Sequence, residues 1–195
     1  MAVEKRFIDA SELLRDSFRL AAQIYQDGLL PDFIVGIWRG GTPVGIAIQE
    51  YFQYAGIASD HISVRTSAYS SINQRNKSIR VHGLHYLIEE ANADSSLLIV
   101  DDVFDTGLSI DALIEDLEKK MRLNLPRKIK IACPFFKPQN NLTKLTPDYY
   151  LYESDEWLVF PHELEGLSVA EIAQHKPEVT DILDLFKIPQ TPQSK

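Results

Sequence analysis

Several common classes of protein are excluded by what this chain has little of. It carries one cysteine among 195 residues, Cys133, so neither an internal disulfide nor a cysteine-only zinc site can form. No apolar run approaches the ~20 residues that a membrane-spanning helix needs, and the first residues, MAVEKRFIDASELL, carry charges where a signal peptide is apolar. We therefore expect a cytoplasmic protein with no membrane partner, and a buried thiol for Cys133 within the apolar run IKIACPFF.

Positive charge is also scarce. The chain has 20 Lys and Arg against 28 Asp and Glu, a net charge of −8, which is the wrong sign for a general nucleic-acid binder. A phosphorylated small molecule remains compatible with this balance, because backbone amides, a metal ion or a few cations can hold a phosphate. The composition is 45% hydrophobic and 25% charged, as in soluble globular proteins.

The apolar pattern alternates between two periods, which predicts strands and helices in turn. We expect an α/β fold with a mainly parallel twisted sheet flanked by helices, in one domain over 1–195. The loops that follow parallel strands meet at one edge of the sheet, where ligands of such folds bind. Strands are predicted at 32–38, 61–67, 96–101, 128–133, 149–152 and 157–160, and helices at 12–26, 43–56, 84–90, 108–121, 168–174 and 177–186, before a frayed tail at 189–195.

Two further segments have a distinctive pattern. In the first predicted helix, the apolar side chains expected to face the core are Leu13, Leu14, Phe18, Ala21, Ala22 and Tyr25. Residues 68–80 are polar, rich in Ser and Asn, and carry three cations, so we expect most of this stretch to be a mobile loop.

The strongest chemical signal is the segment 97–113, LLIVDDVFDTGLSIDAL. Its apolar strand delivers Asp101 and Asp102 to the edge of the sheet, and a Thr-Gly-x-Ser turn then opens a helix, as in a phosphate cradle. Carboxylates beside a phosphate repel it unless they bind hydroxyls or a hard cation such as Mg²⁺. The segment therefore predicts a ligand with sugar hydroxyls, a phosphate and a metal ion. The alternative is structural: Asp105 and Thr106 would cap the helix, and the acid pair would end the strand.

The segment VDDVFDTGLS resembles the phosphoribosyl pyrophosphate (PRPP) motif of type I phosphoribosyltransferases. The resemblance implies that Asp101 and Asp102 bind the ribose hydroxyls and the Mg²⁺–PRPP unit. It also implies that the loop from Asp105 onward wraps the 5′-phosphate through Thr106, Gly107, Leu108 and Ser109. Leu108 and Ser109 depart from the residues common in the family.

The segment IVGIWRGGTPVG is similar to the family's pyrophosphate loop. This similarity implies that Arg39 and the amides of Gly40 and Gly41 meet the diphosphate, and that the peptide bond between Trp38 and Arg39 is cis. Residues 68–80 correspond to a flexible loop that closes over the reacting centre and excludes water.

The later segments PFFKPQ and PDYYLYESDEWLVFPHE resemble the 6-oxopurine branch, the xanthine–guanine and hypoxanthine enzymes. By position, Lys137 donates to the purine O6, Trp157 stacks on the base and the backbone of Leu158 meets its edge, within a base-binding hood at about 137–165. Taken singly, Lys137 fits a surface lysine and Trp157 a tryptophan at the edge of the core.

The resemblance also assigns roles to two acids. Asp105 faces N7 of the base, where it acts as the general base or stabilises the proton that leaves the base, and relatives for other bases tend to have Ala at this position. Glu163 completes the Mg²⁺ shell through water, in a PHE segment where relatives often have Trp in place of His162.

These observations lead us to expect Mg²⁺-dependent transfer of 5-phosphoribosyl from PRPP to N9 of a 6-oxopurine. The partners are then PRPP and a purine base, with no nucleic acid, in a homodimer or homotetramer as is usual for the family. Two alternatives remain open: a regulator that senses PRPP or a nucleotide without turnover, and an enzyme for another acceptor.

Overall fold

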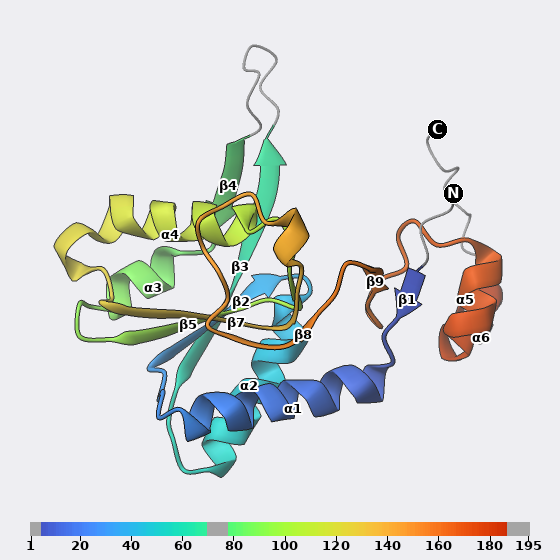
Figure 1. Ribbon diagram of the computed structural model, residues 1–195, viewed down its shortest axis with the longest axis horizontal. Coiled ribbons are helices and arrows are strands. Elements are labelled where there is room, and N and C mark those ends of the chain that lie inside the picture. Colours follow the sequence, from blue (N-terminus) through green and yellow to red (C-terminus); the bar gives the residue numbers. More distant parts are fainter. Residues whose placement is uncertain (1–4, 70–77, 187–195) are drawn as a thin grey trace. The chain divides into compact units, whose positions relative to one another are not determined.

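The structure is a computed structural model that describes residues 5–69 and 78–186 (Figure 1). The chain divides into two compact units. The larger unit comprises residues 11–155, and the smaller unit combines the N-terminal residues up to 10 with residues 156 onward. Within the described residues, no helix has the length and apolar character that crossing a membrane requires.

A seven-stranded sheet forms the centre of the larger unit. Its order is β4-β3-β2-β5-β7-β6, with β8 also paired to β7, and every pairing is parallel except the one between β3 and β4. The predicted mainly parallel α/β fold is confirmed. The strands are β2 (Phe33–Trp38), β3 (Asp60–Tyr69), β4 (Ser78–His82), β5 (Ser96–Val100), β6 (Val103–Phe104), β7 (Lys128–Phe136) and β8 (Tyr149–Glu153).

Helices cover both faces of this sheet (Figure 1). Helices α3 (His85–Glu90) and α4 (Leu108–Met121) pack over one face, and α1 (Ala10–Gln26) and α2 (Gly41–Tyr54) lie over the other. Because both faces are covered, the central strand β5 is buried at every position, which explains its continuous apolar run. Cys133 on β7 is buried as predicted, and burial raises the pKa of its thiol.

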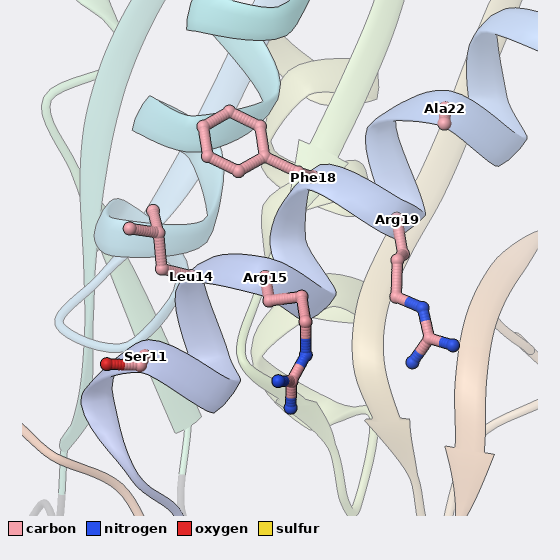
Figure 2. A pocket seen from close by; sticks show the side chains of 6 residues that line it. All are labelled: Ser11, Leu14, Arg15, Phe18, Arg19 and Ala22. Carbon is pink, nitrogen blue, oxygen red and sulfur yellow. The ribbon is translucent and has the colours of Figure 1, made fainter.

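The predicted buried face of α1 is partly wrong. Leu13 and Ala21 are buried, but Leu14, Phe18 and Tyr25 are 53%, 38% and 42% exposed. The buried stripe of the helix instead includes two polar residues, whose presence hid it from the apolar pattern: Asp16, which pairs with Arg19, and Ser17, which donates to the Leu13 carbonyl. An open groove of about 510 Å³ lies along the outer side of the helix, lined by Ser11, Leu14, Arg15, Phe18, Arg19 and Ala22 (Figure 2).

The prediction of a loop over 68–80 is also partly wrong. Strand β3 continues through Tyr69 and strand β4 begins at Ser78, and the two pair antiparallel, with Ala68 opposite Ile79. Residues 70–77, which make up the rest of the predicted loop, lie outside the described residues. Backbone hydrogen bonds form the ladder whatever the side chains are, so a polar composition concealed this two-stranded ribbon.

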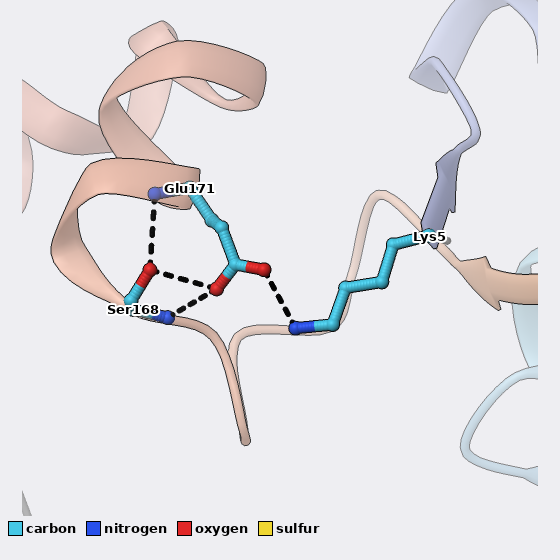
Figure 3. Close-up of polar contacts among 3 residues, drawn as sticks. All are labelled: Lys5, Ser168 and Glu171. Carbon is cyan, nitrogen blue, oxygen red and sulfur yellow. Dashed lines mark hydrogen bonds and ion pairs between the residues drawn. The ribbon is translucent and has the colours of Figure 1, made fainter. Parts of the chain in front are cut away.

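The smaller unit is built from both ends of the chain. Strand β1 (Lys5–Phe7) pairs parallel with β9 (Trp157–Val159), and α5 (Val169–His175) and α6 (Pro177–Phe186) follow. Ser168 and Glu171 form a capping box at the start of α5, and the Lys5 ammonium lies 2.7 Å from the Glu171 carboxylate (Figure 3). The Phe7 ring stacks on His175 with 3.9 Å between ring centroids. The predicted tail at 189–195 lies outside the described residues.

Candidate active site

The loop between β5 and α4 forms a cavity of about 200 Å³. Gly107 ends the loop with a φ of 76°, and a Cβ at this position would lie 2.6 Å from Thr143 Oγ1, so the turn requires glycine. Gly107, not Asp105, is the N-cap of α4. Thr106 Oγ1 accepts the Leu108 N–H at 3.5 Å, so the reading as a helix cap is wrong for Asp105 and holds in part for Thr106. The cavity is lined by Asp101, Asp102, Val103, Phe104, Asp105, Thr106, Gly107, Ser109 and Ile110.

The acid pair lies in the wall of this cavity. Asp102 is buried, and its backbone N–H donates to Asp101 Oδ1 at 3.0 Å. Burial, followed by the neighbouring Asp102 charge, raises the pKa of Asp101 well above its ordinary value, although the N–H groups of Asp102 and Gly41 favour its charged form. A cation beside these two adjacent carboxylates would therefore stabilise their ionised forms.

The donor set of the pair fits Mg²⁺. This ion prefers oxygen ligands and is usually held by one or two carboxylates together with substrate phosphates and water. Asp101 and Asp102 supply two such carboxylates beside the cavity. Across residues 5–69 and 78–186 there is no group of three or more His, Cys, Asp or Glu side chains placed to hold a metal ion.

The Arg-Gly-Gly loop after β2 lies directly against the acid pair. A Cβ on Gly40 would overlap the Asp102 carboxylate at 1.8 Å, and one on Gly41 would lie 2.1 Å from the Val100 carbonyl oxygen. Only glycine allows the two loops to approach so closely. The peptide bond between Trp38 and Arg39 is cis, as the resemblance predicted.

Lys137 follows the last residue of β7 and faces the same loop. Its Nζ lies 3.9 Å from Asp105 Oδ2, and its backbone N–H donates to the Phe104 carbonyl at 2.9 Å. The Lys137 side chain is 11% exposed, so the reading of this residue as an ordinary surface lysine is wrong. The structure thus brings the Lys137 ammonium close to the Asp105 carboxylate. Lys137 is nevertheless far away in the sequence, 31 positions after Thr106 in the motif that contains Asp105.

Two polar residues at this site were missed from the sequence. Asn140, in a short 3₁₀ helix (Pro138–Asn140), donates from Nδ2 to Asp105 Oδ1 at 2.7 Å. Thr66 on β3 donates from Oγ1 to Ser109 Oγ at 3.3 Å. The position of Asn140 three residues after Lys137 was the available signal for the first, and nothing in the local sequence pointed to the second.

The remaining predicted residues belong to the smaller unit. Trp157 is 56% exposed on β9, and the adjacent Leu158 is buried. The Glu163 carboxylate accepts the Phe160 N–H at 2.9 Å. The buried Lys176 ammonium donates to the carbonyls of Phe160 and Pro161 at 2.6 and 3.0 Å, which fixes the turn after β9. The roles of Trp157, Leu158 and Glu163 toward a base or metal stay predictions.

A mainly parallel sheet with a cavity in the loop after its central strand defines a class of fold that comparison with known sequences identifies. The phosphoribosyl transferase domain family matches residues 6–167, so the chain belongs to this family. The chain is 22% identical over 178 residues to a hypoxanthine-guanine phosphoribosyltransferase of Streptococcus pyogenes, covering 91% of this chain and 92% of that protein.

Solved structures show the same fold. A purine phosphoribosyltransferase from Pyrococcus horikoshii matches with a TM-score of 0.65 and 27% identity, over 84% of this chain and 97% of that one. A hypothetical protein from Neisseria gonorrhoeae with bound ppGpp matches with a TM-score of 0.73 and 18% identity, over 93% and 98% of the two chains. The latter similarity supports the fold alone.

Proposed function

We propose that this protein transfers 5-phosphoribosyl from PRPP to N9 of a 6-oxopurine in a Mg²⁺-dependent reaction. The observation that carries the proposal is the juxtaposition of Lys137 Nζ and Asp105 Oδ2, 3.9 Å apart beside the phosphate cradle. Guanine presents O6 and N7 side by side on one edge. An ammonium donor next to a carboxylate acceptor complements O6 together with a protonated N7, whereas the amino group of adenine would face the ammonium donor unfavourably.

Each part of the site then has a chemical task. The turn from Thr106 to Ser109 binds the 5′-phosphate, and Asp101 and Asp102 bind the ribose hydroxyls and the metal. Bound Mg²⁺ supplies positive charge to the diphosphate leaving group. Asp105 accepts the proton that the purine loses as it attacks, so catalysis comes from placement, charge and general-base assistance.

The same proposal assigns the base-side residues and the assembly. Arg39, Gly40 and Gly41 bind the diphosphate, Trp157 stacks on the base, the Leu158 backbone meets its edge and Glu163 completes the metal shell through water. The relatives named hypoxanthine-guanine phosphoribosyltransferase support a purine as the acceptor. We further propose a homodimer or homotetramer in the cytoplasm, and light scattering of the purified protein tests its assembly.

Pyrophosphate release measures the proposed reaction directly. Purified protein is incubated with PRPP, Mg²⁺ and each of hypoxanthine, guanine, xanthine, adenine and uracil. We expect release with at least one 6-oxopurine and none with adenine or uracil. Release with adenine or uracil alone indicates an enzyme for another acceptor. Binding of PRPP or ppGpp without release for any base favours the sensing regulator.

A variant of Lys137 tests the choice of base. Lys137→Met keeps the length of the side chain and removes its charge, so the KM for the 6-oxopurine should rise about tenfold or more, since a hydrogen bond to a charged group is worth ~1.5–3 kcal/mol. Lys144→Met, at an exposed position seven residues along the same connection, is the matched control and should behave as the parent. An unchanged KM in Lys137→Met contradicts the assignment to O6.

A further inference from the structure

We infer that Asn140 is a positioning residue that orients the Asp105 carboxylate toward the base, an inference that rests on the proposed function. Asn140 Nδ2 donates a 2.7 Å hydrogen bond to Asp105 Oδ1 and so engages one of the two carboxylate oxygens. The other oxygen, Oδ2, faces Lys137 Nζ at 3.9 Å. The carboxylate is held on one side by Asn140 and faced on the other by Lys137.

Backbone hydrogen bonds place Asn140 opposite Asp105. The Lys137 N–H donates to the Phe104 carbonyl at 2.9 Å, and the Leu142 N–H donates to the Thr106 carbonyl at 3.0 Å. These two bonds bracket Asp105 in the loop and Asn140 in the facing segment. The Asn140 side chain therefore contacts Asp105 because these hydrogen bonds fix the register between segments 104–106 and 137–142.

The distance between Lys137 and Asp105 shows what this contact prevents. A direct charge-assisted hydrogen bond between an ammonium and a carboxylate is about 2.7–2.9 Å long, and the observed separation is 3.9 Å. If the Asp105 carboxylate turned toward Lys137, the two would form a direct ion pair. A purine would then have to break this ion pair before it could bind to either side chain. The Asn140 bond opposes this rotation, which leaves Asp105 Oδ2 available to N7 and the ammonium available to O6.

The shape of the segment itself depends on a different residue. Asn141 accepts the Thr143 N–H at 2.9 Å and donates to the Leu145 carbonyl at 2.8 Å, and these bonds close the turn. Asn140 is exposed, and its side chain reaches across to Asp105. Substitution of Asn140 thus removes the contact with Asp105 while the bonds of Asn141 remain.

Steady-state kinetics of Asn140→Ala test the inference. We expect kcat/KM for the 6-oxopurine to fall about three- to tenfold, the value of one net hydrogen bond, with the KM for PRPP unchanged. Asn140→Asp should lose more, because a second carboxylate would then face Asp105. Gln139→Ala, at the exposed neighbouring position of the same 3₁₀ helix, is the matched control and should behave as the parent. Parent-like kcat/KM in Asn140→Ala overturns the inference.

The double variant separates positioning from a structural role. In the Asp105→Asn background the carboxylate is already lost, so Asn140→Ala should cause no further fall in kcat/KM. A merely structural residue would lower kcat/KM equally in both backgrounds and would lower the melting temperature as well. An equal loss in the two backgrounds therefore overturns the inference.

A spectroscopic measurement keeps this inference distinct from the proposed function. If the parent releases no pyrophosphate with any base, the proposed function fails, but the contact is still readable from the ¹⁵N–¹H resonances of the Asn140 side-chain amide. These resonances should move in Asp105→Ala and stay in place in Gln139→Ala. Resonances that stay in place in Asp105→Ala overturn the positioning of Asp105 by Asn140, whether or not the protein is active.

Discussion

The proposed phosphate side and the proposed base side of the site are built in different ways. On the phosphate side, the loops after β2 and β5 meet through backbone, and glycines at 40, 41 and 107 permit contacts that a Cβ would block. On the base side, side chains from distant segments meet: Asp105 from the loop, and Lys137 and Asn140 from the connection after β7. The backbone contacts of the phosphate side therefore tolerate few substitutions. The side-chain contacts of the base side can instead be changed by single substitutions.

The largest expected effect lies on the base side, at the proposed proton acceptor. Asp105→Asn keeps the size of the side chain and removes the proposed general base, and general-base assistance is worth ~10²–10⁴ in rate. We expect kcat to fall by about that factor, with the KM for PRPP little changed. Kinetics combined with a thermal melt check this, since the N-cap of α4 is Gly107 and not Asp105. A kcat within about threefold of the parent, well short of the general-base range, contradicts the assignment of Asp105.

The next effect lies on the phosphate side, at the acid pair. Asp101→Asn with Asp102→Asn should weaken PRPP binding about a hundredfold or more, because two hydrogen bonds to charged groups are worth roughly 3 kcal/mol or more together. Titration calorimetry with and without Mg²⁺ measures the effect. Chelation of Mg²⁺ should weaken binding to the parent but change the double variant little. An unchanged affinity in the double variant would show that the pair does not hold PRPP.

A substitution of glycine tests the claim that the phosphate side is built from backbone. Gly41→Ala places a Cβ 2.1 Å from the Val100 carbonyl oxygen, and overpacking of this kind costs ~1–3 kcal/mol of unfolding free energy. Gly45→Ala, in the same helix α2, is the control, because the nearest atom to its Cβ, Ile34 Cγ2, is 3.8 Å away. Urea denaturation should show a loss for the first and little or no loss for the second. Equal unfolding free energies for Gly41→Ala and Gly45→Ala would contradict the claim that close backbone contacts build the phosphate side.

The smallest effect concerns the unit that carries Trp157. Hydrogen bonds from Lys5 and Ser168 lower the pKa of Glu171 from 4.5 to about 2. Because the pKa is lower in the folded protein, the stabilising effect is fully present above pH 4.5 and is lost as the pH falls through about 2. Hydrogen exchange of the β1 and β9 amides in the parent and in Glu171→Gln measures it. The β1 and β9 amides of the parent should exchange more slowly than those of Glu171→Gln at pH 6, and most of this difference should be lost by pH 2.

The same contrast explains how much could be predicted from the sequence. The buried parallel strands, the helices and the motif from Asp101 to Ser109 were predictable, because continuous apolar runs and backbone turns leave local signals. The short strands β1, β4 and β6 were not predicted. The buried stripe of α1 was not, since Asp16 and Ser17 lie inside it. The position of Asn140 near Lys137 was a weak signal, but its contact with Asp105 was not predictable, because the two residues are 35 positions apart and the contact depends on the register between two segments.

The burial of Cys133 has a practical consequence. The chain's single thiol is fully buried, and burial raises its pKa, so very little reactive thiolate is present at neutral pH. A cysteine introduced at an exposed position would therefore react first with maleimide reagents, without prior removal of the native thiol. Tyr54, the last residue of α2, and Leu123, in the 3₁₀ helix (Arg122–Asn124) that follows α4, are each 94% exposed. A fluorophore pair at these positions would allow energy-transfer measurements in the otherwise unaltered protein.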